Sequence, residues 1–65
     1  MNFGEAIEEL KAGKKVKREA WGSGAHLAIF KEEDAPMIGW QSDHHPRETY
    51  RPSVPDMLAE DWEIL

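Results

Sequence analysis

Arg18 and Trp21 are the residues of this sequence whose types and spacing best suit a binding site. An arginine guanidinium is a planar fork of hydrogen-bond donors that matches anionic oxygens, and an indole ring offers a face on which a flat ring can stack. The two residues lie three positions apart, across an expected strand end and turn, so both side chains could face one cleft. In the alternative interpretation, Trp21 is a core residue and Arg18 is its solvent-facing neighbour.

Four further residues are candidates for the same site. Gly22 begins a Gly-Ser-Gly run that could lend backbone amides to an anion, although a plain tight turn is the simpler explanation. Tyr50 and Arg51 stand beside a proline-rich break in the chain, where side chains project from a strand end. Trp40 could belong to the core, to a subunit interface or to a pocket.

The titratable residues have structural explanations as well as chemical ones. Asp56 and Asp61 could accept ligand hydroxyls, but Asp56 also suits the first turn of a helix, where the helix dipole favours a carboxylate. His44 and His45 invite a metal interpretation. Adjacent histidines point to opposite sides of an extended chain, however, and no zinc-ligand spacing is visible, so a polar turn and no metal site are predicted.

Size and charge exclude several classes of protein. The net charge is −5, and a general nucleic-acid binder needs a surplus of lysine and arginine to displace counterions. Five basic residues between positions 11 and 18 nevertheless leave room for a local anion site. A chain of 65 residues without cysteine forms one small domain, residues 1–65, with a marginal core and no disulfide. We therefore expect a homo-oligomer.

Other classes are disfavoured by missing patterns. The chain has no apolar run of about 20 residues, and its N-terminus lacks the basic and apolar regions of a signal peptide. It also lacks a nucleophile elbow of the Gly-x-Ser-x-Gly type and a Walker-type phosphate loop. We therefore predict a cytoplasmic, non-catalytic binding protein with no cofactor. A small interaction adaptor that uses exposed tryptophans as anchors is the alternative.

The predicted elements form an α+β domain, in which an N-terminal helix packs on a small antiparallel sheet. Phe3, Ala6, Ile7 and Leu10 share one helical face, and Asn2 with Glu5 has capping-box spacing. Strands are expected at residues 15–18, 26–30, 37–41 and 48–51, separated by a charged connector at 31–36 and a polar turn at 42–46. A helical turn capped by Ser53 then runs to about residue 59 and leads to a final strand.

The last strand is expected to supply the core. Trp62 alternates with Ile64 on one strand face, and we interpret Trp62 as a buried scaffold residue. Phe3, Leu10 and Leu58 are expected to pack near it.

The two ends of the chain together are similar to a known family. The run Phe3-Gly4-Glu5-Ala6-Ile7, followed by Arg18 and Trp21, combines with Asp56-Met57-Leu58-Ala59-Glu60-Asp61-Trp62-Glu63 in an order that resembles the Thoeris anti-defense type-two family. The resemblance covers residues 2–30 and 50–65 and is loose between them.

This resemblance implies a fold and a function. Members of the family are small α+β proteins of phages and prophages that assemble into dimers and tetramers, with ligand pockets between protomers. They capture a cyclic nucleotide-derived signal, such as glycocyclic ADP-ribose, and hold it intact. The resemblance thus implies that Trp21 stacks on a base and that Arg18 binds phosphate. It also implies an aromatic role for Tyr50, either as a second stacking face or at an interface.

Overall fold

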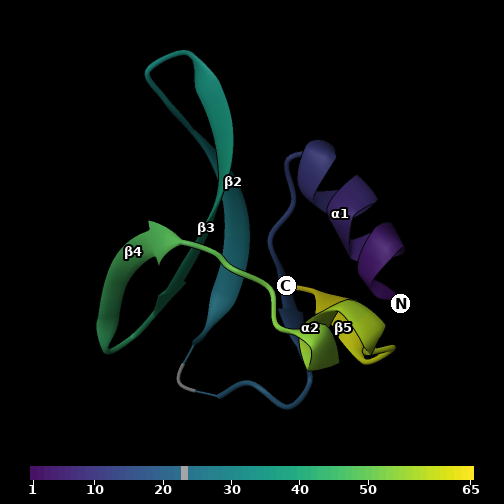
Figure 1. Ribbon diagram of the computed structural model, residues 1–65. Coiled ribbons are helices and arrows are strands. Elements are labelled where there is room, and N and C mark those ends of the chain that lie inside the picture. Colours follow the sequence, from purple (N-terminus) through teal and green to yellow (C-terminus); the bar gives the residue numbers. More distant parts are fainter. Residues whose placement is uncertain (23) are drawn as a thin grey trace.

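The computed structural model describes residues 1–22 and 24–65, and in it one helix lies against one face of a sheet (Figure 1). The α+β prediction is confirmed. In chain order the elements are α1 (Phe3–Lys11), β1 (Val16–Arg18), β2 (His26–Glu32), β3 (Ala35–Ser42), β4 (His45–Thr49), α2 (Val54–Leu58) and β5 (Trp62–Ile64).

Helix α1 begins and ends where its sequence predicts. The Asn2 side chain accepts a hydrogen bond from the backbone amide of Glu5, and the Glu5 side chain accepts one from the backbone amide of Asn2. These two bonds complete the predicted capping box. Gly13 follows the helix with a φ of 90°, a left-handed conformation that glycine adopts without steric cost. Ala6 and Leu10 turn the apolar side of the helix toward the sheet and are fully buried.

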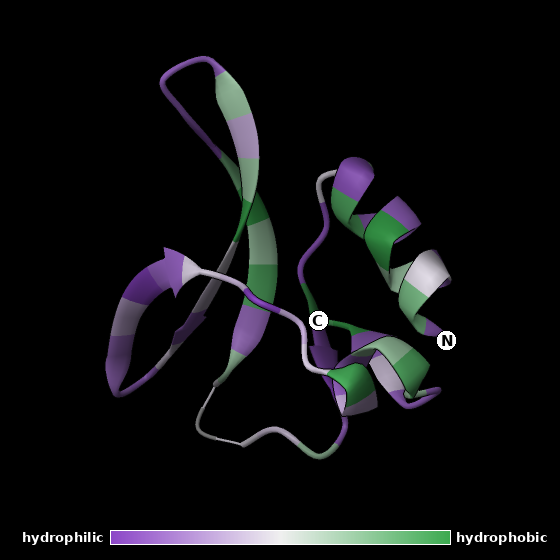
Figure 2. Ribbon diagram, viewed as in Figure 1, coloured by the Kyte–Doolittle hydropathy of each residue, from purple (hydrophilic) through white to green (hydrophobic). Residues whose placement is uncertain are grey.

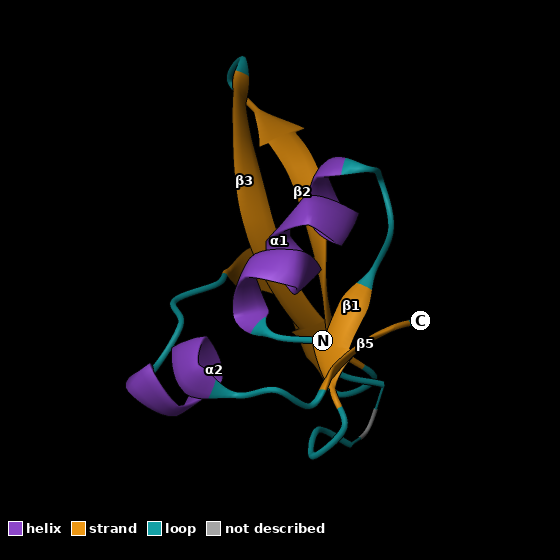
Figure 3. Ribbon diagram, turned by 90° about the vertical axis from the view of Figure 1, so that its right-hand side faces the viewer, coloured by secondary structure: helices purple, strands orange, loops and turns teal. Residues whose placement is uncertain are grey.

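The five strands form an antiparallel sheet in the order β4-β3-β2-β1-β5. The pairing of β1 with β5 joins residues far apart in sequence and places Arg18 opposite Trp62. The side view shows α1 in front of the sheet, with the β2–β3 hairpin extending past the end of the helix (Figure 3). The helix therefore covers only part of one sheet face.

The predicted connector at residues 31–36 is wrong, because β2 and β3 run through it. Lys31 pairs with Pro36 and Glu32 with Ala35, which leaves a turn of only two residues. These two, Glu33 and Asp34, have φ angles of 52° and 71°. The charged side chains there are exposed, so the apolar alternation that signals a strand is missing although the backbone pairs fully.

The predicted turn at 42–46 is too long, and the predicted strand at 48–51 lies too far toward the C-terminus. Strand β3 continues to Ser42, the turn is made by Asp43 and His44, and β4 ends at Thr49. All five residues of β4 are exposed, so this edge strand carries no apolar pattern that would locate it. The hairpin tip and β4 are correspondingly hydrophilic (Figure 2).

One glycine lets the outer part of the sheet pack. A Cβ on Gly39 would collide with the Phe30 ring and would lie 2.9 Å from Cγ of Arg47. The ring therefore lies over the glycine, with the Arg47 guanidinium carbon 3.8 Å from the ring centroid. This packing stabilises the sheet face that α1 does not cover.

Trp62 is the centre of the core, as predicted. It is only 2% exposed and packs with Leu10, Val16 and Leu27, while the Phe3 ring lies 5.5 Å from it. The prediction that Leu58 packs nearby is wrong, since this side chain is 76% exposed. Ala59, the residue that follows α2, packs against the core instead.

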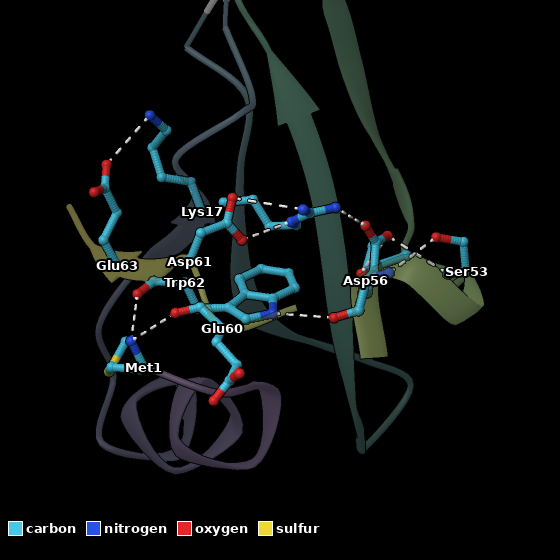
Figure 4. Close-up of polar contacts among 10 residues, drawn as sticks. Met1, Lys17, Ser53, Asp56, Glu60, Asp61, Trp62 and Glu63 are labelled. Carbon is cyan, nitrogen blue, oxygen red and sulfur yellow. Dashed lines mark hydrogen bonds and ion pairs between the residues drawn. The ribbon is translucent and has the colours of Figure 1, made fainter. Parts of the chain in front are cut away.

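The short helix α2 is held at both sides by polar contacts (Figure 4). Ser53 and Asp56 form a second capping box, and the Trp62 indole donates to the backbone carbonyl of Asp56 at 3.1 Å. The Met1 ammonium donates to the carbonyl of Trp62 at 3.0 Å, beside the carbonyl of Glu60. These contacts lock α2 and β5 against the start of the chain.

Candidate functional site

An open cleft of about 850 Å³ lies where helix α1 leaves the sheet uncovered. Its walls come from the segment after β1, from β3 and β4, and from the connection into α2. The residues that line it are Ala20, Trp21, Gly22, Ala25, Trp40, Glu48, Thr49, Tyr50, Arg51 and Asp56. The cleft thus draws on segments that are distant in sequence but close in space.

Aromatic rings form much of the wall. Trp21 lies edge-on to Tyr50, with ring centroids 6.2 Å apart, and edge-on to the buried Trp62 at 5.3 Å. Trp21 is half-buried, so it belongs both to the border of the core and to the cleft. Trp40 is also half-buried and lies edge-on to His45 at 5.5 Å. Three aromatic side chains therefore line the cleft and are only partly buried.

A network of charged groups lies behind the Tyr50 side of the wall. The Arg18 guanidinium donates through Nε to Asp61 at 2.8 Å and through Nη1 to Asp56 at 3.1 Å. The other Asp56 oxygen accepts a hydrogen bond from the Tyr50 hydroxyl at 2.8 Å. These contacts tie β1, α2 and the residue before β5 to one another, and they fix the Tyr50 ring against Trp21.

The network shifts the pKa values of its members. Hydrogen bonds to Asp61 and Asp56 raise the pKa of Arg18, and the Arg18 hydrogen bond lowers that of Asp61. Burial alone would raise the pKa of Asp56, but hydrogen bonds from Tyr50, Arg18 and Ser53 outweigh it and lower the pKa. Burial, together with the bond to Asp56, raises the pKa of Tyr50. Asp56 is therefore a fixed anion and Tyr50 a fixed donor.

Two charged residues of the cleft are differently placed. Glu48 lies on β4 and Arg51 follows it, and both are exposed. In the part of the chain that the structure describes, no ion pair involves either side chain. The cleft therefore presents one carboxylate and one guanidinium to solvent, while Asp56 is paired with Arg18.

Most of the predicted site residues come together in this cleft. Those that line it are Trp21, Gly22, Trp40, Tyr50, Arg51 and Asp56. Arg18 stands apart, because it lies behind the wall with its guanidinium bonded to two carboxylates. The predicted use of the Gly-Ser-Gly amides falls partly on Ser23, which lies outside the described residues.

Four lining residues were not predicted, namely Ala20, Ala25, Glu48 and Thr49. The alanines have no side chain that signals a site. Glu48 pairs directly with Trp40 in the antiparallel register, so a correctly placed β3–β4 turn would have indicated it. The displaced turn hid this signal.

Neither a metal cluster nor a membrane-spanning helix is present among the residues that the structure describes. No three of their His, Asp and Glu side chains are grouped closely enough to hold a metal ion. None of their helices is long and apolar enough to cross a membrane.

The fold and the site define a small α+β domain with an aromatic surface cleft. The family model of the Thoeris anti-defense 2-like domain matches residues 1–65, and the chain belongs to this family. It is similar to Thoeris anti-defense 2 of Bacillus phage SP01, at 31% identity over 84 residues, covering 100% of this chain and 94% of that protein. The resemblance drawn from the sequence is confirmed, and the family gives the chain an anti-defense role.

This chain and the phage SP01 protein also differ in length. The alignment with the phage SP01 protein extends over 84 residues, whereas this chain has 65. The relative therefore contains segments that have no counterpart here.

Proposed function

We propose that this protein sequesters a cyclic nucleotide-derived immune signal, of the glycocyclic ADP-ribose type or a cyclic oligonucleotide, and thereby silences an anti-phage defence. The observation that carries the proposal is the aromatic cleft in a chain of the Thoeris anti-defense 2-like family. Its volume of about 850 Å³ lies within the range of small-molecule sites, roughly 300–1,000 Å³. Flat bases bind to aromatic faces, which each contribute about 1–3 kcal/mol.

In this proposal the ligand contacts are divided among the lining residues. Trp21, Trp40 and Tyr50 supply stacking surfaces, and the backbone at Gly22 borders the ligand. Arg51 binds phosphate, because its guanidinium is exposed on the cleft. This assignment replaces the role expected for Arg18.

Arg18 and Asp56 have a positioning role in the proposal. They hold the Tyr50 hydroxyl and the start of α2 in place, so the ring of Tyr50 faces the cleft in one orientation. A pre-organised wall reduces the ordering cost of binding.

Holding the signal without cutting it is consistent with the chemistry of Asp56. A general base needs a pKa near the working pH and a free lone pair directed at the substrate. Hydrogen bonds lower the pKa of Asp56, and both of its oxygens already accept them. We therefore propose stoichiometric binding with no turnover.

We further propose that the protein acts in the host cytoplasm as a homo-oligomer, a dimer or tetramer whose protomers together close the cleft. The cleft is open, and beside it α2 exposes Val54, Met57 and Leu58. Exposed apolar side chains gathered on one short element are typical of a contact surface.

The decisive test is binding followed by recovery of the ligand. Purified protein is titrated calorimetrically with glycocyclic ADP-ribose and a panel of cyclic oligonucleotides, and the complex is then heated and the released ligand is analysed by mass spectrometry. Saturable binding with return of the intact signal is the expected result. A smaller product would establish an enzyme. If no signal binds at micromolar protein and Trp21→Ala alters only protein–protein contacts, the adaptor alternative holds instead.

A further inference from the structure

The charged groups of the cleft divide into bonded and open ones, and only the open ones can meet a ligand. Asp56, which lines the cleft, bonds to Arg18 and to Tyr50, and Arg18, behind the wall, bonds to Asp61 as well. Glu48 and Arg51 are exposed in the same lining, and in the described part of the chain neither forms an ion pair. The polar recognition available at the surface is therefore one acceptor carboxylate and one guanidinium.

The register of the sheet places Glu48 beside an aromatic ring. Glu48 is the direct antiparallel partner of Trp40, and directly opposed residues project to the same sheet face with Cβ atoms about 5 Å apart. Both line the cleft. Since the sugar is attached directly to the base in a nucleotide, a base stacked on Trp40 brings its sugar next to the Glu48 carboxylate.

We propose that Glu48 is the specificity residue of the cleft, accepting a hydrogen bond from the free hydroxyl of the sugar attached to the stacked base; this inference rests on the proposed function. An ionised carboxylate has two acceptor oxygens and no donor, so it is suited to accept a hydrogen bond from a sugar hydroxyl. The same recognition of ribose hydroxyls by an acidic residue is known in dinucleotide-binding folds. Arg51, three positions further on, then faces the phosphate attached to that sugar.

The position of Glu48 also restricts the charge of the ligand. A phosphate brought beside the carboxylate is repelled, although solvent screens this repulsion because Glu48 is exposed. In the lining, Arg51 is the exposed cation that can offset such charge. The cleft thus favours a ligand with a hydroxyl-bearing sugar and a single phosphate cluster over one that places several phosphates along the wall.

Comparing the signal with analogues that lack one hydroxyl tests this role of Glu48. Wild type and Glu48→Gln are titrated with glycocyclic ADP-ribose and with analogues in which one ribose hydroxyl at a time is replaced by hydrogen. One of these analogues lacks the hydroxyl that bonds to Glu48. We expect wild type to bind this analogue about tenfold more weakly than the parent signal, because a hydrogen bond to a charged acceptor is lost. In Glu48→Gln this preference falls to about threefold or less, since the neutral amide oxygen is a weaker acceptor.

Glu32→Gln is the control. Glu32 is exposed at the end of β2, outside the cleft lining, and its substitution changes the net charge by the same amount. This variant should keep the wild-type preference, and because each protein is compared with itself, general charge attraction cancels. Thermal unfolding of all three proteins verifies that they fold.

Three results would overturn the role of Glu48. If Glu48→Gln and wild type lose the same factor on hydroxyl removal, Glu48 does not read the sugar, although the signal is still sequestered. If the Glu32→Gln control also loses the preference, the effect comes from net charge and not from position. If wild type binds no signal at all, the proposed function fails, and the role of Glu48 fails with it.

Discussion

Arg18 and Arg51 both carry a guanidinium group, but the two groups have different surroundings and therefore different roles. Arg18 lies in a paired strand and bonds to Asp61 and Asp56 at 2.8 and 3.1 Å. Arg51 stands in an exposed stretch that borders the cleft. A guanidinium whose donors are satisfied by carboxylates of its own chain has little capacity left for a phosphate. At the residue scale, the function of an arginine is thus decided by its neighbours.

These two arginines should respond to substitution in opposite ways. Arg51→Ala should weaken binding of glycocyclic ADP-ribose about tenfold by removing a charge-assisted bond, with little change in the melting temperature. Arg18→Ala should instead lower the melting temperature by roughly 5 °C, because it leaves two carboxylates near each other without a cation. Calorimetric titration and thermal unfolding of both variants provide the comparison. A large loss of affinity in Arg18→Lys at unchanged stability would contradict this assignment.

The sequence could not distinguish the two arginines. The two partners of Arg18, Asp61 and Asp56, lie 43 and 38 positions away and reach it only through the tertiary fold, Asp61 through the pairing of β1 with β5. No local spacing encodes such a contact. Trp62 was predictable as a core residue, in contrast, because its alternation with Ile64 is a local feature of the chain.

At the scale of elements, local signals decided which predictions held. Asn2 with Glu5 and Ser53 with Asp56 both form capping boxes whose spacing is written in the sequence. The β2–β3 turn has no such signal. Type I′ hairpin turns normally use Asn-Gly or Asp-Gly, because both central residues need positive φ, whereas this chain has Glu33 and Asp34 there. The connector was mispredicted for this reason.

Changing the two turn residues should stabilise the β2–β3 hairpin. Glu33→Asn with Asp34→Gly should raise the free energy of unfolding by about 1 kcal/mol, because both new residues adopt left-handed backbone at low cost. Chemical denaturation measures the change. The matched control, Glu33→Ala with Asp34→Ala, removes the same two charges but keeps a Cβ at each position. It should not stabilise the protein, and an equal gain in both variants would show that charge removal was responsible.

At the scale of the whole molecule, the Arg18 network connects stability to pH. The pKa values of Asp56 and Asp61 are lowered on folding from an ordinary value of 3.8. Their contribution is therefore fully present above about pH 5 and is lost as the pH falls through the lowered values. The pKa of Tyr50 is raised from 10.0, so its contribution is present below that pH and is lost as the pH rises further.

Melting temperatures between pH 2 and pH 11 should accordingly show a plateau with two falling limbs. Asp61→Asn should flatten the acid limb, since its side chain no longer titrates, and Tyr50→Phe should flatten the alkaline one. Each curve is compared with wild type at every pH, so that the general titration of lysines cancels. An acid limb that is equally steep in Asp61→Asn and wild type would show that other carboxyls govern acid unfolding.

Because α1 covers only part of the sheet, some residues are constrained by burial in the core and others are not. Leu10, Val16, Leu27 and Trp62 make the buried scaffold, whereas β4 and the stretch after it face solvent throughout most of their length. Substitutions between positions 45 and 51, with the exception of the half-buried Tyr50, can therefore accumulate without disturbing the core. Under the proposed function, specificity for the signal can therefore change through this stretch while the scaffold is kept. The scaffold, held by the two ends of the chain, makes the cleft free to diversify.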